Sequence, residues 1–127
     1  MAALPADLRA VMKPMTKYTN NTGGSGDTES KVTVTTDYLP LLAEFEIFGA
    51  RTNANSYEQN HQAQYDYYKA GNSKKKYKHN STGSSANWWE RSAYYTYSAT
   101  FCYVTSNGYA NYNSATNAYG VAPAFKV

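Results

Sequence analysis

The last third of this 127-residue chain is built largely of tyrosine and small polar residues, and this composition limits how it can pack. Seven tyrosines lie between Tyr94 and Tyr119, and Asn, Ser and Thr fill most of the positions among them. A dry core would not use these residues, because each buried hydroxyl or amide without a partner costs about 1–3 kcal/mol. Antibody paratopes favour them, since tyrosine gives a large contact area at a low entropic cost. The segment therefore predicts a binding surface. Ordinary strand residues are the alternative, because tyrosine is also a good strand former.

Length and charge restrict the class of protein. A single domain over residues 1–127 is expected, because a chain of this length can bury a core without disulfides or metals. The net charge of +3 indicates solubility more than a dedicated polyanion partner, so no nucleic-acid partner is expected. The one cysteine, Cys102, cannot form an internal disulfide. The apolar runs near 1–15 and 39–48 are short and interrupted, so neither membrane insertion nor a secretory signal is expected.

Local patterns predict several elements in the first half of the chain. Residues 5–12 favour a short helix that Pro14 ends, and residues 18–27 favour a flexible loop because they are rich in Gly and short polar residues. The alternating β-branched residues of 31–36 predict a half-buried strand. Residues 39–49 predict a buried extended run followed by a short helical turn that its last residue, a glycine, closes.

A second helix is predicted from Ser56 onward. Apolar and amphipathic residues recur there at intervals of three and four, and Gly71 follows as a helix stop, which fits a helix of about three to four turns. The basic run 74–80 predicts a solvated loop, with a phosphate-backbone contact as the alternative. Residues 120–127 predict a closing strand that Pro123 restricts to an edge.

The sequence from Thr100 to Asn111 predicts a β-hairpin, because Asn107-Gly108 readily adopts the positive φ angles of a tight turn. Period-2 alternation divides its side chains between two faces. One face is expected to hold Cys102, Val104 and Ala110 inside, and the other to present Tyr103, Thr105, Tyr109 and Asn111 to solvent.

No catalytic or metal-binding constellation is evident. Cys102 has no base nearby in its segment, so a buried structural thiol is favoured over a nucleophile. His61 and His79 lack partners at metal-ligand spacing, so no metal and no cofactor are expected. Trp88 and Trp89 are interpreted as scaffold, because adjacent strand residues point to opposite faces. A sugar-stacking platform is the alternative.

Several of these segments resemble a known family. Ala86–Ser92, Phe101–Val104 and Gly120–Phe125 are similar to the frame of the variable region in diversity-generating-retroelement variable proteins, many of them encoded by phages or prophages. Leu41–Gly49 and Gln64–Tyr68 are similar to further parts of these proteins.

The resemblance covers roughly residues 39–127 and implies both a fold and a function. The implied fold is α+β and C-type-lectin-like, with small antiparallel sheets, two helices and a variable region at about 88–127. In that family a reverse transcriptase copies a template with errors at adenines, so Asn codons (AAC or AAT) diversify, for instance to Tyr, Ser or Thr, while the frame stays fixed. The implied protein is a hypervariable ligand-binding domain and not an enzyme.

The binding residues expected from this resemblance are Tyr94, Tyr95, Thr96, Tyr97, Thr100, Tyr103, Thr105, Tyr109, Asn111, Tyr112, Asn113, Asn117 and Tyr119. The implied partner is a host cell-surface protein or glycan, and the implied location is the virion, at a tail-fibre tip, or a bacterial cell surface. Such a domain can also form a homo-oligomer within a larger fibre or surface protein. Two alternatives stay open: a structural or decoration domain of a virion, and an enzyme related to formylglycine-generating proteins that uses Cys102.

Overall fold

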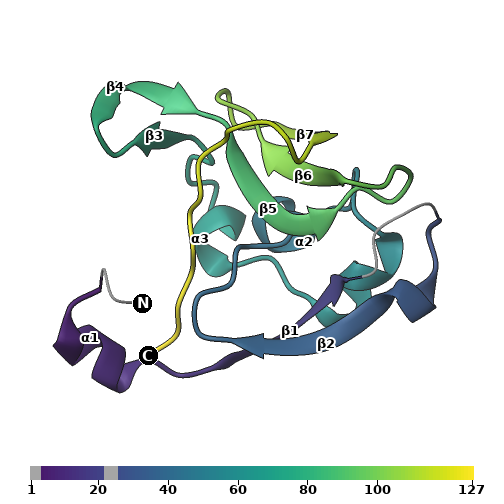
Figure 1. Ribbon diagram of the computed structural model, residues 1–127, viewed down its shortest axis with the longest axis horizontal. Coiled ribbons are helices and arrows are strands. Elements are labelled where there is room, and N and C mark those ends of the chain that lie inside the picture. The colour runs from purple at the N-terminus through teal and green to yellow at the C-terminus, as the bar shows by residue number, and fades with distance from the viewer. Residues whose placement is uncertain (1–3, 22–25) are drawn as a thin grey trace.

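The computed structural model describes residues 4–21 and 26–127 and has an α+β architecture with small antiparallel sheets (Figure 1). Helix α1 (Ala6–Val11) precedes β1 (Met15–Asn20), and β1 pairs with β2 (Val32–Asp37) after the 3-10 turn η1 (Glu29–Lys31). The two strands form a long ribbon along the bottom of Figure 1.

The other two sheets come from the second half of the chain. Strands β3 (Lys76–Lys78) and β4 (Ser81–Ala86) form a hairpin that projects at the upper left of Figure 1. A three-stranded sheet follows in the order β5-β6-β7, with the bounds Trp88–Ala93, Thr100–Val104 and Ala110–Ser114.

Short helical segments connect the two halves of the chain. They are α2 (Glu44–Phe48), the 3-10 segment η2 (Ser56–His61) and α3 (Asp66–Lys69). Gly49 ends α2 with a φ of 68°, a left-handed conformation that glycine adopts without steric cost. Within the described ranges, no helix has the length and apolar character that crossing a bilayer requires.

The core lies between α2, α3 and the inner face of the three-stranded sheet. Its buried side chains are Leu42, Ile47, Tyr68, Trp88 and Val104. The C-terminal segment runs in an extended path across these elements and ends beside α1 (Figure 1), where the Lys13 N–H donates to the Lys126 carbonyl at 2.7 Å. This bond joins the segment after α1 to the C-terminal segment.

Several local predictions are confirmed. The N-terminal helix, the turn closed by Gly49 and the strand at 32–37 are all present, and the hairpin turns at Gly108 with a φ of 88°. Each of these elements depends on residues that are close together in the sequence. Strand β2 is more exposed than the half-buried strand that was predicted, since Val34 and its neighbours face solvent.

The predicted helix of three to four turns from Ser56 is wrong. The chain instead forms η2, an extended stretch and the single turn α3. Side-chain amides explain the interruption, because Gln62 donates to the Tyr18 carbonyl and Gln64 donates to the Ile47 carbonyl, at 2.8 and 2.9 Å. These tertiary bonds hold an extended backbone in place of helical bonds. Gly71, with a φ of 89°, still ends α3 as expected.

Three further predictions need correction. The loop predicted at 18–27 begins too early, because residues 18–20 belong to β1, and part of it, 22–25, lies outside the described residues. The run 74–80 is not all loop, because its middle forms β3. The closing strand predicted at 120–127 consists only of isolated bridges at Gly120 and Lys126, since this segment crosses other elements and does not run along a strand.

Candidate ligand-binding surface

The register of the three-stranded sheet fixes which side chains share a face. Trp88 lies opposite Val104, and Val104 lies opposite Ala110, so this set faces the core. Trp89 lies opposite Tyr103 on the other face of the sheet. The interpretation of Trp88 as scaffold is confirmed, because its ring is buried among core residues.

One group of rings covers the outer face of the sheet. We call Trp89, Tyr103 and Tyr119 the outer cluster. Tyr119 lies 4.6 Å from each of the other two rings, and Trp89 lies 5.9 Å from Tyr103. Asn113 donates to the Tyr119 hydroxyl at 2.9 Å. Tyr103 lies beneath its two neighbours and is only 7% exposed, so the prediction that it points into solvent is wrong.

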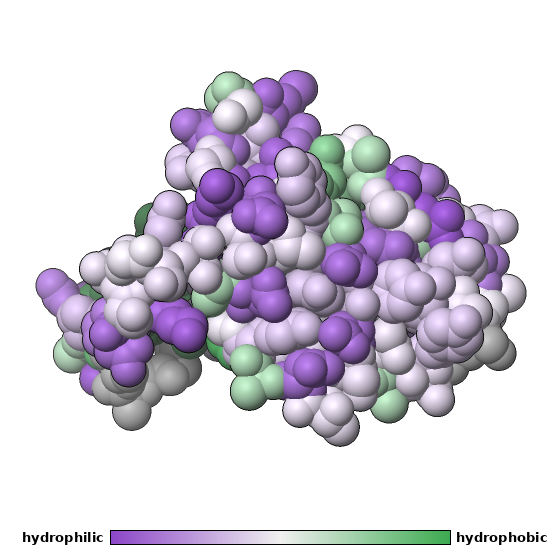
Figure 2. All heavy atoms as spheres, turned by 90° about the horizontal axis from the view of Figure 1, so that it is seen from above, coloured by the Kyte–Doolittle hydropathy of each residue, from purple (hydrophilic) through white to green (hydrophobic). Residues whose placement is uncertain are grey.

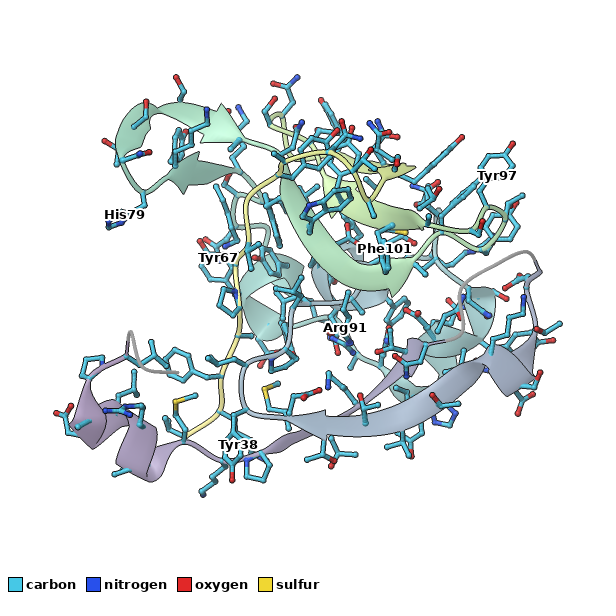
Figure 3. All side chains as sticks on the ribbon, in the orientation of Figure 1. Tyr38, Tyr67, His79, Arg91, Tyr97 and Phe101 are labelled. Carbon is cyan, nitrogen blue, oxygen red and sulfur yellow. The ribbon has the colours of Figure 1, made fainter. Side chains whose placement is uncertain are left out.

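A second group of rings lies at the end of the sheet near the β5–β6 connection. We call Tyr94, Tyr95, Tyr97 and Tyr112 the edge cluster. Tyr94 is buried and stacks on Tyr112 with centroids 3.8 Å apart and planes 4° apart. Tyr97 is 59% exposed and projects at the right of Figure 3. The Arg51 guanidinium lies 4.3 Å from the centre of the Tyr95 ring, a cation–π contact.

The two clusters lie on opposite sides of the sheet. Tyr112 is opposite Cys102 in the strand register, whereas Tyr103 is the next residue along β6 and so points to the other side. The expectation of a single tyrosine face therefore needs correction, because the chain leaves β5 at Tyr94 and carries the edge cluster around the end of the sheet.

The remaining predicted residues lie around these clusters. Tyr109 is 69% exposed at the β6–β7 hairpin, where its N–H donates to the Thr105 hydroxyl at 3.0 Å. Asn117 is partly used in structure, because its amide donates to the Ser114 carbonyl. Asn111 is exposed, and half-buried positions hold Thr96, Thr100, Thr105, Asn113, Asn117 and Tyr119.

Figure 2 views the molecule from the side where β4 and β7 lie uppermost. Most of this face is purple to near-white, and green atoms are confined to scattered spots. Tyrosine, serine and threonine have such intermediate hydropathy, so the face is amphipathic and suits a ligand with both rings and hydrogen-bonding groups.

Buried carboxylates hold the loops beneath this surface, and sequence reasoning missed them. Glu44 accepts backbone N–H bonds from Thr52, Asn53 and Ala54 at 2.7–3.1 Å. Glu58 accepts from the Asn20 N–H and from the Ser92 hydroxyl, both at 2.8 Å. Each carboxylate thus accepts hydrogen bonds from backbone N–H groups that would otherwise be buried without a partner.

Arg91 and Glu46 form a buried ion pair with two contacts, at 2.6 and 3.0 Å. The same guanidinium donates to the Thr19 hydroxyl in β1 and to the Leu41 carbonyl ahead of α2. One side chain of β5 therefore ties the sheet to both the β1–β2 ribbon and α2. The only sequence signal was the presence of two glutamates inside the apolar run 39–49.

Glu90 is the one buried carboxylate with no hydrogen-bond partner on either oxygen within residues 4–21 and 26–127. Burial, together with the nearby charges of Glu44 and Glu58, raises the pKa of Glu90 well above its usual value. A raised pKa favours the protonated, neutral form of this buried side chain.

Glu44, Glu90 and Cys102 place their ligand atoms within 4.8 Å of one another, so this is where a metal could be held. The Glu44 carboxylate in this group already accepts backbone N–H bonds on both oxygens. Burial and the adjacent Glu90 and Glu44 raise the pKa of the Cys102 thiol, which favours its neutral form.

These features define a small α+β domain whose last sheet carries two groups of clustered rings on a rigid, hydrogen-bonded base. The chain belongs to a family described as a domain of unknown function, DUF6273, which matches residues 1–127. No curated protein and no solved structure matches the chain.

The raised pKa of Glu90 predicts a specific pH dependence of stability. A carboxyl group whose pKa is raised by folding stabilises the native state below the unfolded pKa, and this contribution is lost as pH rises through the folded pKa. Glu90→Gln is neutral at every pH. The substitution should therefore raise the free energy of unfolding at about pH 8 by about 1.4 kcal/mol or more, the equivalent of one pKa unit, with little change at about pH 5.

Thermal or urea unfolding across this pH range measures the effect, with Glu29→Gln as a control that makes the same change of residue at an exposed position. A Glu90→Gln protein that is destabilised at both pH values, together with a lower midpoint of the wild type in chelator, would show that the carboxylate binds a metal and would contradict this account.

Proposed function

We propose that this chain is a ligand-binding domain that uses its surface tyrosines to grip a host cell-surface protein or glycan. The proposal rests on one observation: exposed rings pack against buried ones. Tyr112 is 38% exposed and lies flat on the buried Tyr94. Rings held in this way lose little conformational entropy when a partner covers them, so more of the contact energy appears as affinity.

The division between frame and surface supports diversification by a retroelement. Trp88, Cys102 and Val104 belong to segments that resemble the fixed frame, and all three are buried. Tyr97 and Tyr109 are among the residues proposed to vary, and both are largely exposed. Copying errors at exposed positions change the ligand without unfolding the domain. The buried Tyr94 and Tyr103 are exceptions that act as supports for the rings above them, and the frame residues Phe101, Val121 and Phe125 are exceptions of the opposite kind because they are exposed.

The proposed fold within the α+β class is C-type-lectin-like. Its support here is the resemblance in residues 39–127 together with the pairing of the two chain ends through Lys13 and Lys126. The proposed location, on the same grounds, is a phage tail-fibre tip or a bacterial cell surface.

Two other functions receive less support. A nucleophilic role for Cys102 requires an accessible thiolate, whereas this thiol is fully buried and its pKa is raised. A decoration domain of a virion would bury the exposed tyrosines in a contact with a neighbouring subunit. An oligomer whose interface covers Tyr97 and Tyr109 would favour that function.

Substitution of exposed tyrosines tests the binding function. Tyr97→Ala and Tyr112→Ala should each weaken binding by about 2 kcal/mol, because a few aromatic anchors usually carry most of the energy of an interface. The thermal midpoint of Tyr97→Ala should stay close to that of the wild type, since Tyr97 is 59% exposed, whereas Tyr112→Ala also removes a ring that stacks on the buried Tyr94. The measurement is binding of the labelled domain to a panel of bacterial strains, titrated on the strains that bind the wild type.

Tyr67→Ala is the matched control, because Tyr67 is also 59% exposed and lies outside both clusters, on α3 (Figure 3). It should leave binding unchanged. If no strain binds the wild type, or if Tyr67→Ala weakens binding as much as Tyr97→Ala, the proposed function is wrong.

The retroelement part of the proposal has its own test in the surrounding DNA. A second, near-identical copy of the segment encoding residues 88–127 should lie beside a reverse-transcriptase gene. That copy should carry AAC or AAT codons where this chain has Tyr97, Tyr109 and the other surface residues named above. Sequencing of the complete locus checks this, and a locus without the copy rules out diversification while leaving the binding function to the substitutions.

A further inference from the structure

The charges of the chain are distributed unevenly, although its net charge is small. The only acidic residue after Asp66 is Glu90, and it is buried at 2% exposure. The same part of the chain contains five lysines between Lys69 and Lys78. The surface formed by residues 67–127 therefore carries positive charge with no exposed carboxylate to oppose it.

Part of this charge lines a groove of about 920 Å³ between the β3–β4 hairpin and the segment 118–122. Lys76, Lys78 and His79 line it from the hairpin, and none of the described residues in its wall is acidic. The Lys76 ammonium group lies 4.9 Å from the centre of the Trp88 ring at the groove wall, and it forms no salt bridge with a carboxylate among the residues that the structure describes.

The opposite wall can lie close to the sheet because of Gly120. Its N–H donates to the Asn87 carbonyl at 2.8 Å and its carbonyl accepts from the Trp89 N–H at 2.9 Å. A side chain at this position would meet the Asn87 carbonyl at 3.3 Å. The groove wall thus depends on the glycine and on backbone bonds, and it exists before any ligand binds.

The remaining lining combines rings with small polar groups. The exposed Tyr77 and the half-buried Tyr119 contribute rings, and Ser85 and Ser106 contribute hydroxyl groups. Tyr119 also belongs to the outer cluster, so the groove continues into the aromatic surface. Figure 3 shows His79 on the hairpin at the far left and Tyr97 at the far right, which separates the groove from the edge cluster.

We propose that this groove binds an acidic polysaccharide, with Lys76 and Lys78 pairing to sugar carboxylates and the Tyr77 and Tyr119 rings packing against sugar faces. The inference rests on the proposed function and names the class of ligand. Charge complementarity favours an anion. The mixture of rings and hydroxyls favours a sugar chain, and the sequence lacks a nucleic-acid-binding motif that would point to DNA or RNA.

Calorimetric titration with polygalacturonate tests the proposal, with its methyl ester as an uncharged polymer of the same backbone. The wild type should bind polygalacturonate with an affinity that falls as salt is added, and should not bind the ester. The Lys76→Gln, Lys78→Gln double variant should lose about tenfold or more in affinity, since it removes two hydrogen bonds to charged groups.

The Lys13→Gln, Lys69→Gln double variant is the control, because it removes the same charge from exposed positions that do not line the groove. It should change the affinity less than about twofold. Equal losses in the two double variants, or absence of polygalacturonate binding, would overturn the groove assignment. Tighter binding of polyglutamate or of a single-stranded oligonucleotide than of polygalacturonate would overturn the assignment to a sugar chain.

Tyr97→Ala separates this inference from the proposed function. Its effect is measured on strain binding, whereas the groove is tested with polygalacturonate, and Tyr97 lies far from His79 of the groove (Figure 3). If strain binding depends on Tyr97 while polygalacturonate does not bind, only the groove inference fails.

Discussion

The ion pair between Arg91 and Glu46 is the contact on which the rest of this structure depends. It is buried and has two hydrogen-bonded contacts, and Arg91 also holds β1 and the backbone ahead of α2. Loss of one partner of such a pair leaves an uncompensated buried charge, which typically costs about 3–5 kcal/mol. Because its helices are short and its sheets have only two or three strands, the fold depends for its rigidity on this pair and on the Glu44 and Glu58 carboxylates that bind loops.

Because the base of the last sheet is rigid, its surface can carry tyrosines. Because the buried side chains of β5 and β6 fix the sheet, rings such as Tyr97 and Tyr109 contribute little to the core and remain free to contact a partner. In our proposal, the positive groove beside them adds a charged contact to an aromatic one. Stability and recognition are then assigned largely to different residues, and the buried Tyr94 and Tyr103 contribute to both.

The sequence predicted elements that depend on nearby residues. The hairpin at Gly108 and the helix end at Gly49 follow from the backbone freedom of single glycines. Contacts between distant residues were not predictable in this way. The helix expected from Ser56 is interrupted because Gln62 and Gln64 bind carbonyls far away in the chain.

The candidate site shows the same limit. The tyrosine composition predicted a binding surface, but its division into two clusters depends on strand register and on where the chain leaves β5. The buried glutamates Glu46 and Glu58 escaped notice because their partners are distant in the sequence: Arg91 is 45 residues from Glu46, and Asn20 and Ser92 are 38 and 34 residues from Glu58. The groove was missed because the small net charge hides how unevenly lysines and carboxylates are distributed along the chain. The fold brings several of these lysines to one surface.

Under the proposed function, surface residues are replaceable and frame residues are not. A protease-resistance scan of all single substitutions from position 88 to 127 tests this difference. Tyr97 and Tyr109 should accept nearly every residue without loss of resistance, whereas Trp88 and Val104 should accept almost none. Equal intolerance at Tyr97, Tyr109 and Trp88 would contradict it, because the exposed tyrosines would then be part of the core.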